Sequence, residues 1–99
     1  MAHSYEEIRK VAIELLAGHE RPNYSLTQYE HFRLSIGGVF ARREGREINS
    51  QDAQLDSEDN ELFLEVFWDL FRQGIITLGL NNSSREFPWF RVTRLGERI

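Results

Sequence analysis

The sequence predicts a small α+β domain in which three helices precede a β-hairpin and the start of a further helix. Three stretches place apolar residues three and four positions apart behind a helix-start signal, which is typical of amphipathic helices. After Gly74 the pattern changes to short β-branched and aromatic runs on either side of the turn cluster 81–84, which indicates a hairpin. A chain of 99 residues can form one hydrophobic core, so we expect a single domain over residues 1–99.

The first helix is predicted over Tyr5–Ala17. Ser4 and Glu7 have the spacing of a capping box, in which each side chain bonds to the backbone amide of the other residue. Gly18 is the predicted end of this helix. Its apolar residues follow the helical spacing at Tyr5, Ile8, Ala12, Leu15 and Leu16.

The second helix is predicted to begin at a cap on Ser25, because Ser25 and Gln28 repeat the spacing of a capping box. Its apolar stripe consists of Tyr29, Phe32, Ile36, Val39 and Phe40. Gly37 and Gly38 lie inside this helix, where each costs about 1 kcal/mol relative to alanine. They therefore mark a kink, a break or a site of close packing, and the sequence leaves these three explanations open.

The third helix is predicted to begin at a cap on Asp56 or Ser57 and to continue to Gln73. Acidic residues fill its first turn, where they interact favourably with the helix dipole. Gly74 is its predicted end.

The hairpin is predicted from the runs Ile75–Leu78 and Phe87–Val92. Thr93 follows as the cap of a further helix over residues 93–99. Since the chain ends where that helix begins, we expect the domain to be part of a longer protein.

Two stretches in the second half of the chain resemble winged helix-turn-helix domains. Leu70–Ile76 (LFRQGII) is similar to the end of a recognition helix that leads into a wing. Phe90–Gly96 (FRVTRLG) is similar to the return strand of the wing, as in MarR-like and PadR-like regulators. The resemblance covers residues 57–99 and implies a recognition helix at Asp56–Gln73, a wing tip at Asn81–Glu86, and DNA binding in transcription regulation.

The net charge of −4 is unevenly distributed along the chain. Residues 47–70 contain eight acidic and no basic residues, whereas residues 21–46 and 71–99 each contain five basic and two acidic residues. Arginine binds phosphate through paired hydrogen bonds, so we expect the arginine-rich segments to contact the backbone of double-stranded DNA. The candidate DNA-binding residues are Arg85, Arg91 and Arg94 in and after the hairpin, and Arg42, Arg43 and Arg46 after the second helix. The alternative for Arg91 and Arg94 is that they pair with acidic residues of the third helix.

The third helix departs from what base reading in the major groove requires. Its polar face contains four acidic residues, which phosphate repels: Glu58, Glu61, Glu65 and Asp69. Its apolar residues occupy a wide arc, about 240° of the helix circumference. The alternative function is therefore a protein-interaction or oligomerisation module, whose partner is another protein or a second copy of the chain in a homodimer. Its candidate residues are Glu61, Glu65, Asp69 and Trp68 in the third helix, and Trp89 and Phe90 in the hairpin.

The sequence does not support an enzymatic or cofactor-binding class, and we expect no catalytic residues, metal site or cofactor. The chain contains no cysteine, and His3, His19 and His31 lie in different segments without the spacing of metal ligands or of a catalytic triad. No apolar run approaches the roughly 18 residues that a membrane span needs, and the N-terminus does not have the pattern of a signal peptide. We therefore expect a cytoplasmic protein that does not associate with membranes.

Overall fold

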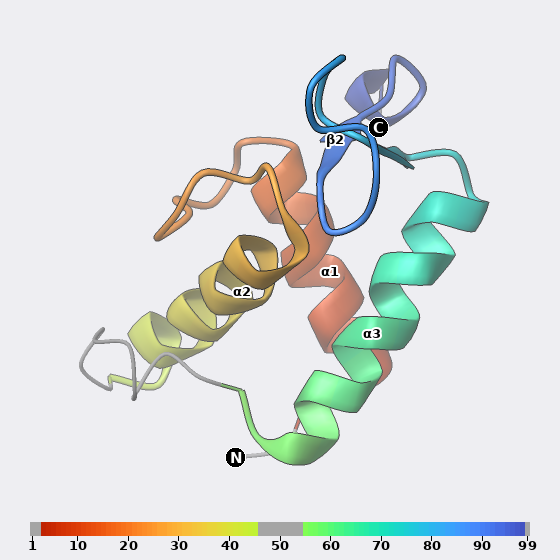
Figure 1. The fold of residues 1–99 in the computed structure, drawn as a ribbon. Coiled ribbons are helices and arrows are strands. Elements are labelled where there is room, and N and C mark those ends of the chain that lie inside the picture. Colours follow the sequence, from red (N-terminus) through yellow and green to blue (C-terminus); the bar gives the residue numbers. More distant parts are fainter. Residues whose placement is uncertain (1–2, 46–54, 99) are drawn as a thin grey trace.

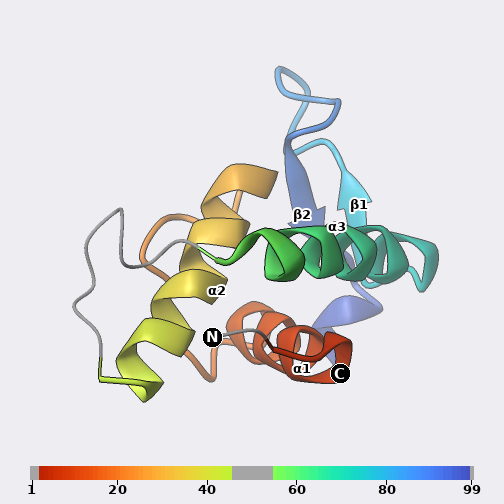
Figure 2. The same ribbon diagram turned by 90° about the horizontal axis from the view of Figure 1, so that it is seen from below.

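The computed structural model describes residues 3–45 and 55–98, and over these residues the chain forms an α+β domain. Three helices are followed by a two-stranded antiparallel hairpin and a short 3-10 turn (Figure 1). The elements are α1 (Tyr5–Leu16), α2 (Tyr29–Arg43), α3 (Ser57–Arg72), β1 (Ile76–Leu78), β2 (Phe90–Val92) and η1 (Gly96–Arg98). α1 packs between α2 and α3, and the hairpin extends away from the helices beyond α3 (Figure 2).

The capping box predicted at the start of α1 is confirmed. The Oγ of Ser4 accepts a hydrogen bond from the amide of Glu7 at 3.1 Å, and the Glu7 carboxylate accepts one from the amide of Ser4 at 2.9 Å. These hydrogen bonds lower the pKa of Glu7. The helix ends at Leu16, one residue before the predicted end, and Gly18 follows with a φ of +80°.

The second helix begins at Tyr29, so the prediction that Ser25 caps it is wrong. Gln28, the residue before Tyr29, is extended and forms an antiparallel bridge with Trp89 of the hairpin. The carbonyl of Thr27 accepts a hydrogen bond from the amide of Phe90 at 3.0 Å. The amide of Tyr29 donates to the carbonyl of Pro88 at 2.9 Å. Pairing with a segment distant in sequence therefore sets the start of the helix, and the Pro88 carbonyl satisfies the amide of Tyr29, one of the first-turn donors that have no partner within the helix.

Close packing explains Gly38 inside α2, which runs without a break from Tyr29 to Arg43. A Cβ added at Gly38 would lie 2.1 Å from Nδ2 of Asn23 and 2.7 Å from its Cγ. The Oδ1 of Asn23 accepts a hydrogen bond from Nη1 of Arg42 at 3.2 Å. Gly38 therefore provides the space in which the loop between α1 and α2 packs against the helix.

We expect Gly38→Ala to lower the stability of the domain even though alanine is the better helix former. Alanine gains about 1 kcal/mol in helix propensity, but forcing an extra methyl group into a filled site costs about 1–3 kcal/mol. The measurement is the midpoint of urea unfolding followed by circular dichroism. In an Asn23→Ala background the same substitution should become stabilising, because the amide that blocks the Cβ is absent. A stabilising effect in both backgrounds would contradict the close-packing explanation.

The third helix contributes Phe63 and Phe67 to the aromatic core. It begins after the N-cap Asp56 and ends at Arg72, and Gly74 follows with a φ of +75°, so both predicted ends are confirmed to within one residue. Phe67 is fully buried at the centre of this core. Its ring lies 5.0–5.5 Å from three other rings, those of Tyr29, Trp68 and Phe90.

The predicted hairpin is confirmed, but its second strand begins at Phe90, three residues after the predicted start, because residues 87–89 belong to the connection. Ile76 pairs with Val92 and Leu78 pairs with Phe90. Thr93 holds the base of the hairpin, because its amide donates to the carbonyl of Ile75 at 2.9 Å. Its Oγ1 accepts a hydrogen bond from the amide of Gly96 at 2.9 Å, which is the predicted capping role. Over the residues described, the segment that follows is the 3-10 turn η1.

Candidate functional site

The connection between β1 and β2, residues 79–89, has a defined backbone conformation. Gly79 has a φ of +88°, and a Cβ there would lie 2.5 Å from the carbonyl oxygen of Arg85, so this position requires glycine. Oδ1 of Asn81 accepts hydrogen bonds from the amides of Ser83 at 2.8 Å and Ser84 at 2.9 Å. These bonds fix the turn, after which the chain folds back so that the backbone of Arg85 lies against Gly79.

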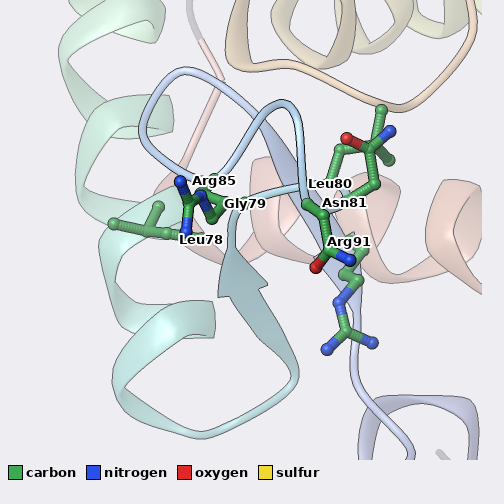
Figure 3. A pocket seen from close by; sticks show the side chains of 7 residues that line it. Leu78, Gly79, Leu80, Asn81, Arg85 and Arg91 are labelled. Atoms are coloured by element: carbon green, nitrogen blue, oxygen red, sulfur yellow. The ribbon is translucent and has the colours of Figure 1, made fainter.

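An open recess of about 320 Å³ lies along the hairpin. It is lined by Leu78, Gly79, Leu80, Asn81, Asn82, Arg85 and Arg91. Arg85 and Arg91 lie on different sides of this recess (Figure 3). Since the two guanidinium groups do not converge, the recess suits an extended polyanion with separate phosphates better than one small anion.

In the described part of the chain, the arginines of the hairpin and its exit have no acidic partners. Arg85, Arg91 and Arg94 are exposed, and among residues 3–45 and 55–98 their guanidinium groups form no hydrogen bond or ion pair. The alternative prediction, that Arg91 and Arg94 pair with acidic residues of the third helix, is therefore wrong for the described part of the chain. Three positive charges remain available to a ligand.

Arg42 and Arg43 lie at the end of α2 and are occupied by contacts within the domain. Arg43 forms ion pairs with Glu20 at 2.7 Å and with Glu14 at 3.3 Å. Arg42 donates to the carbonyl of Arg21 at 2.8 Å. The hydrogen bond from Arg43 lowers the pKa of Glu20. These two arginines tie α2 to α1 and the loop that follows it, so they do not join the hairpin arginines in one surface.

Arg46, which was predicted to bind DNA together with Arg42 and Arg43, lies outside the described residues.

The outer face of α3 is acidic and partly apolar, as predicted. Glu61 and Glu65 are exposed. Asp69 is instead a structural residue: its Oδ2 accepts a hydrogen bond from the hydroxyl of Tyr5 at 2.5 Å, and its Oδ1 pairs with Arg72. The hydrogen bond from Tyr5 lowers the pKa of Asp69. Of the three predicted interface carboxylates, only Glu61 and Glu65 are therefore available to a partner.

The predicted aromatic interface residues differ in exposure. Phe90 is fully buried, so its prediction as an interface residue is wrong. Phe90 points into the core because it pairs with Leu78 on the face of the hairpin that packs against α3. Trp68 and Trp89 are half-buried. The backbone of Trp89 forms an antiparallel bridge with Gln28, which attaches the hairpin to the start of α2.

Leu64 is an exposed apolar residue that the sequence interpretation placed in the buried arc of the third helix. Its exposed fraction is 45%, and that of Phe87 in the hairpin connection is also 45%. The ring of Phe87 stacks on Trp68 with the centroids 5.7 Å apart. The sequence feature that could have indicated the exposure of Leu64 is its position at the edge of the apolar arc, next to Glu61 and Glu65.

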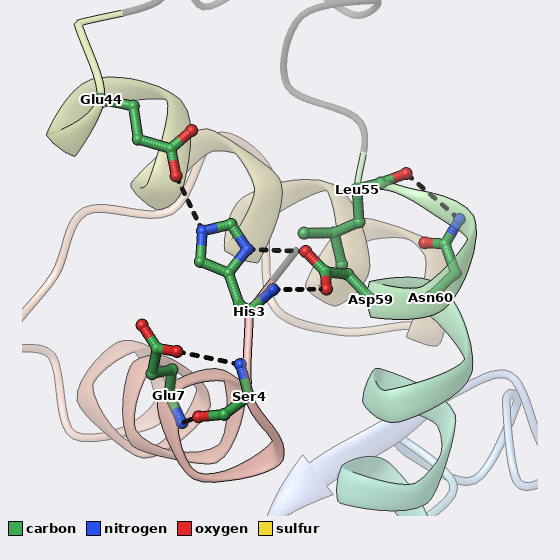
Figure 4. Close-up of polar contacts among 7 residues, drawn as sticks. All are labelled: His3, Ser4, Glu7, Glu44, Leu55, Asp59 and Asn60. Carbon is green, nitrogen blue, oxygen red and sulfur yellow. Dashed lines mark hydrogen bonds and ion pairs between the residues drawn. The ribbon is translucent and has the colours of Figure 1, made fainter. Parts of the chain in front are cut away.

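His3 belongs to a polar cluster that the sequence did not reveal, because its partners lie in other helices (Figure 4). Its Nδ1 lies 2.6 Å from the carboxylate of Asp59, and its Nε2 lies 2.7 Å from that of Glu44. The amide of His3 also donates to Asp59 at 2.8 Å. Burial by itself would lower the pKa of His3, but the hydrogen bonds to Asp59 and Glu44 outweigh it and raise the pKa above 6.5. This cluster fastens the N-terminal residues to α2 and α3.

Among the residues that the structure describes, no group of three or more histidine, aspartate or glutamate side chains is arranged to hold a metal ion. None of the described helices is long and apolar enough to cross a membrane. Comparison with models of protein families, with curated proteins and with solved structures found no match to this chain.

Proposed function

We propose that this chain is a non-enzymatic winged helix-turn-helix domain that binds the phosphate backbone of double-stranded DNA through the β1–β2 hairpin. The observation that carries the proposal is the contrast between two groups of arginines. Those on α2 and α3 pair with carboxylates, as Arg33 does with Glu30 and Arg72 does with Asp69. Those in and after the hairpin, Arg85, Arg91 and Arg94, have no such partners among the described residues. The order of the elements is also the one that the resemblance to winged helices implies.

The acidic outer face of α3 decides how the DNA would be approached. Glu61 and Glu65 are exposed there, and phosphate would repel them if the helix entered a groove. The hairpin extends away from the helices (Figure 2). Contact through the hairpin alone therefore gives binding to the backbone that is sensitive to salt and insensitive to base sequence.

The experiment is fluorescence anisotropy of a labelled random duplex titrated with the domain at two salt concentrations. If three arginines each neutralise one phosphate, the affinity should fall roughly 40-fold between 50 and 200 mM salt. Arg85→Gln/Arg91→Gln should weaken binding at the lower salt concentration and flatten the salt dependence to about a third of its slope.

The matched control is Lys10→Gln/Arg21→Gln, which changes the net charge equally at two exposed positions outside the hairpin. This variant should bind the duplex nearly as well as the unaltered chain. Equal losses in the two double variants would show an effect of net charge alone and would contradict the assignment to the hairpin. Absence of binding at the lower salt concentration would contradict DNA binding itself.

A further inference from the structure

Four side chains form one exposed apolar surface where α3 meets the hairpin connection. Leu64, Trp68 and Phe71 are spaced four and three residues apart, so they lie on one stripe of α3. Phe71 is 38% exposed, and its ring lies 5.8 Å from Trp68 in an edge arrangement. Phe87 stacks on the other side of Trp68 and extends the stripe beyond the helix. These four residues are called the apolar surface below.

Carboxylates border the apolar surface. Glu61 and Glu65 flank Leu64 and Trp68 along α3, and Glu86 precedes Phe87. All three are exposed, and within the described ranges their carboxylates make no hydrogen bond or ion pair. An apolar surface with unpaired acidic residues along its edge is complementary to a ligand with apolar residues in its centre and basic residues at its edges.

The charge and shape of this surface distinguish among possible ligands. DNA would bring phosphates against Glu61 and Glu65. A second copy of the chain, docked with its two-fold axis at Trp68, would bring the acidic edges of both copies into one interface. A helix that carries an apolar stripe flanked by lysine or arginine meets neither repulsion. The stripe from Leu64 to Phe71 is about 10 Å long, which equals two turns of such a helix.

We propose that the apolar surface is the docking site for a basic amphipathic helix of a partner protein. The apolar stripe of that helix packs against Leu64, Trp68, Phe71 and Phe87, and its basic side chains pair with Glu61 and Glu65. This inference does not depend on DNA binding by the hairpin, because three of its four apolar residues lie on α3 and its ligand has the opposite charge.

The test measures the binding of three labelled synthetic peptides of about 18 residues, long enough to form a stable helix on the surface. The first has a leucine stripe flanked by lysine and arginine, and the second has the same stripe flanked by glutamate. The third has the composition of the first in an order that removes the stripe. We expect the first peptide to bind at least 10-fold more tightly than either of the others, with a blue shift of tryptophan emission as Trp68 is covered.

Substitutions then locate the site. Leu64→Ser and Phe71→Ser should each weaken binding of the first peptide about 10-fold, as the loss of a central apolar contact does. Glu61→Gln/Glu65→Gln should weaken it about 5-fold and reduce its salt dependence. The matched controls are Leu95→Ser and Glu97→Gln, which alter an exposed leucine and an exposed glutamate near η1 and should leave binding unchanged. Circular dichroism verifies that each variant is folded.

Three results would overturn the proposal. The first is equal binding of the basic, acidic and reordered peptides, or binding of the first peptide that does not respond to substitutions in the apolar surface. The second is a dimer of the domain, measured by light scattering, that Leu64→Ser dissociates, because the occupant would then be a second copy. The third is loss of duplex binding in Leu64→Ser, which would assign the surface to DNA. Loss of duplex binding confined to the hairpin variants concerns only the proposed function.

Discussion

Replacing Phe67 with alanine is expected to lower the free energy of unfolding by about 3–5 kcal/mol, the usual cost of removing a buried aromatic side chain. Phe67 is fully buried, and its ring contacts lie in three parts of the fold. The rings of Tyr29 on α2 and Phe63 on α3 lie 5.0 and 6.3 Å away, and that of Phe90 in the hairpin lies 5.5 Å away. Because these rings belong to α2, α3 and the hairpin, a shift of one element alone would leave part of the cavity open.

This loss is large relative to the stability of a small domain, about 5–15 kcal/mol. Urea unfolding followed by circular dichroism measures it directly, and the thermal midpoint should fall by about 4–8 °C for each kcal/mol. The matched control is Phe71→Ala, one helical turn later, where the ring is 38% exposed. We expect that variant to lose less than about 1.5 kcal/mol, since less apolar area leaves water there. Similar losses in both variants would contradict the central position of Phe67.

Several elements could be predicted because their signals are local. The Ser4–Glu7 capping box, the end of α3 before Gly74 and the cap at Thr93 each depend on residues within one helical turn. The change of period after Gly74 predicted the hairpin for the same reason. Such signals fix element type and approximate bounds, and the structure agrees with them.

The start of α2 could not be predicted, because it depends on pairing between segments far apart in the chain. Ser25 and Gln28 match a capping box as well as Ser4 and Glu7 do. The hydrogen bonds from the hairpin to Thr27 and Tyr29 keep Gln28 extended just before the helix, and no local pattern reports them. A helix propensity is a weak preference that such tertiary contacts override.

The residues of the candidate site could be predicted only in part, because their availability also depends on contacts between segments far apart in the chain. Arginine composition indicated where positive charge is available, but the ion pairs that occupy Arg42 and Arg43 form with residues of α1 and its following loop. Aromatic composition indicated an interface, but which of Phe87 and Phe90 faces the core depends on the side of the hairpin that packs on α3. Phe90 is buried and Phe87 is 45% exposed, and only the assembled fold distinguishes them.

The second large effect is expected at His3, whose imidazole lies between two carboxylates. The side chain of Asp59 is 1% exposed, and that of His3 is 8% exposed. The ring of His3 also stacks on Phe40, with the centroids 3.7 Å apart. His3→Ala removes the cation and leaves the Asp59 carboxylate buried with fewer partners, which costs roughly 3 kcal/mol in comparable buried pairs. Urea unfolding at pH 6 measures this loss.

The contribution of His3 should also depend on pH in a defined direction. The pKa of His3 is raised above 6.5 in the folded state, so the folded protein binds the proton more tightly than the unfolded chain. The stability from this pair is therefore fully present below about pH 6.5, and it is lost as the pH rises through the folded-state pKa.

His3→Gln retains hydrogen-bonding groups without the charge, so the difference in unfolding free energy between it and the unaltered chain should shrink as the pH rises through the folded-state pKa of His3. His19→Gln, at an exposed position, should follow the unaltered chain at every pH. A constant difference between His3→Gln and the unaltered chain would mean that the imidazole contributes as a neutral hydrogen-bonding group, and that the two carboxylates do not hold a cation between them.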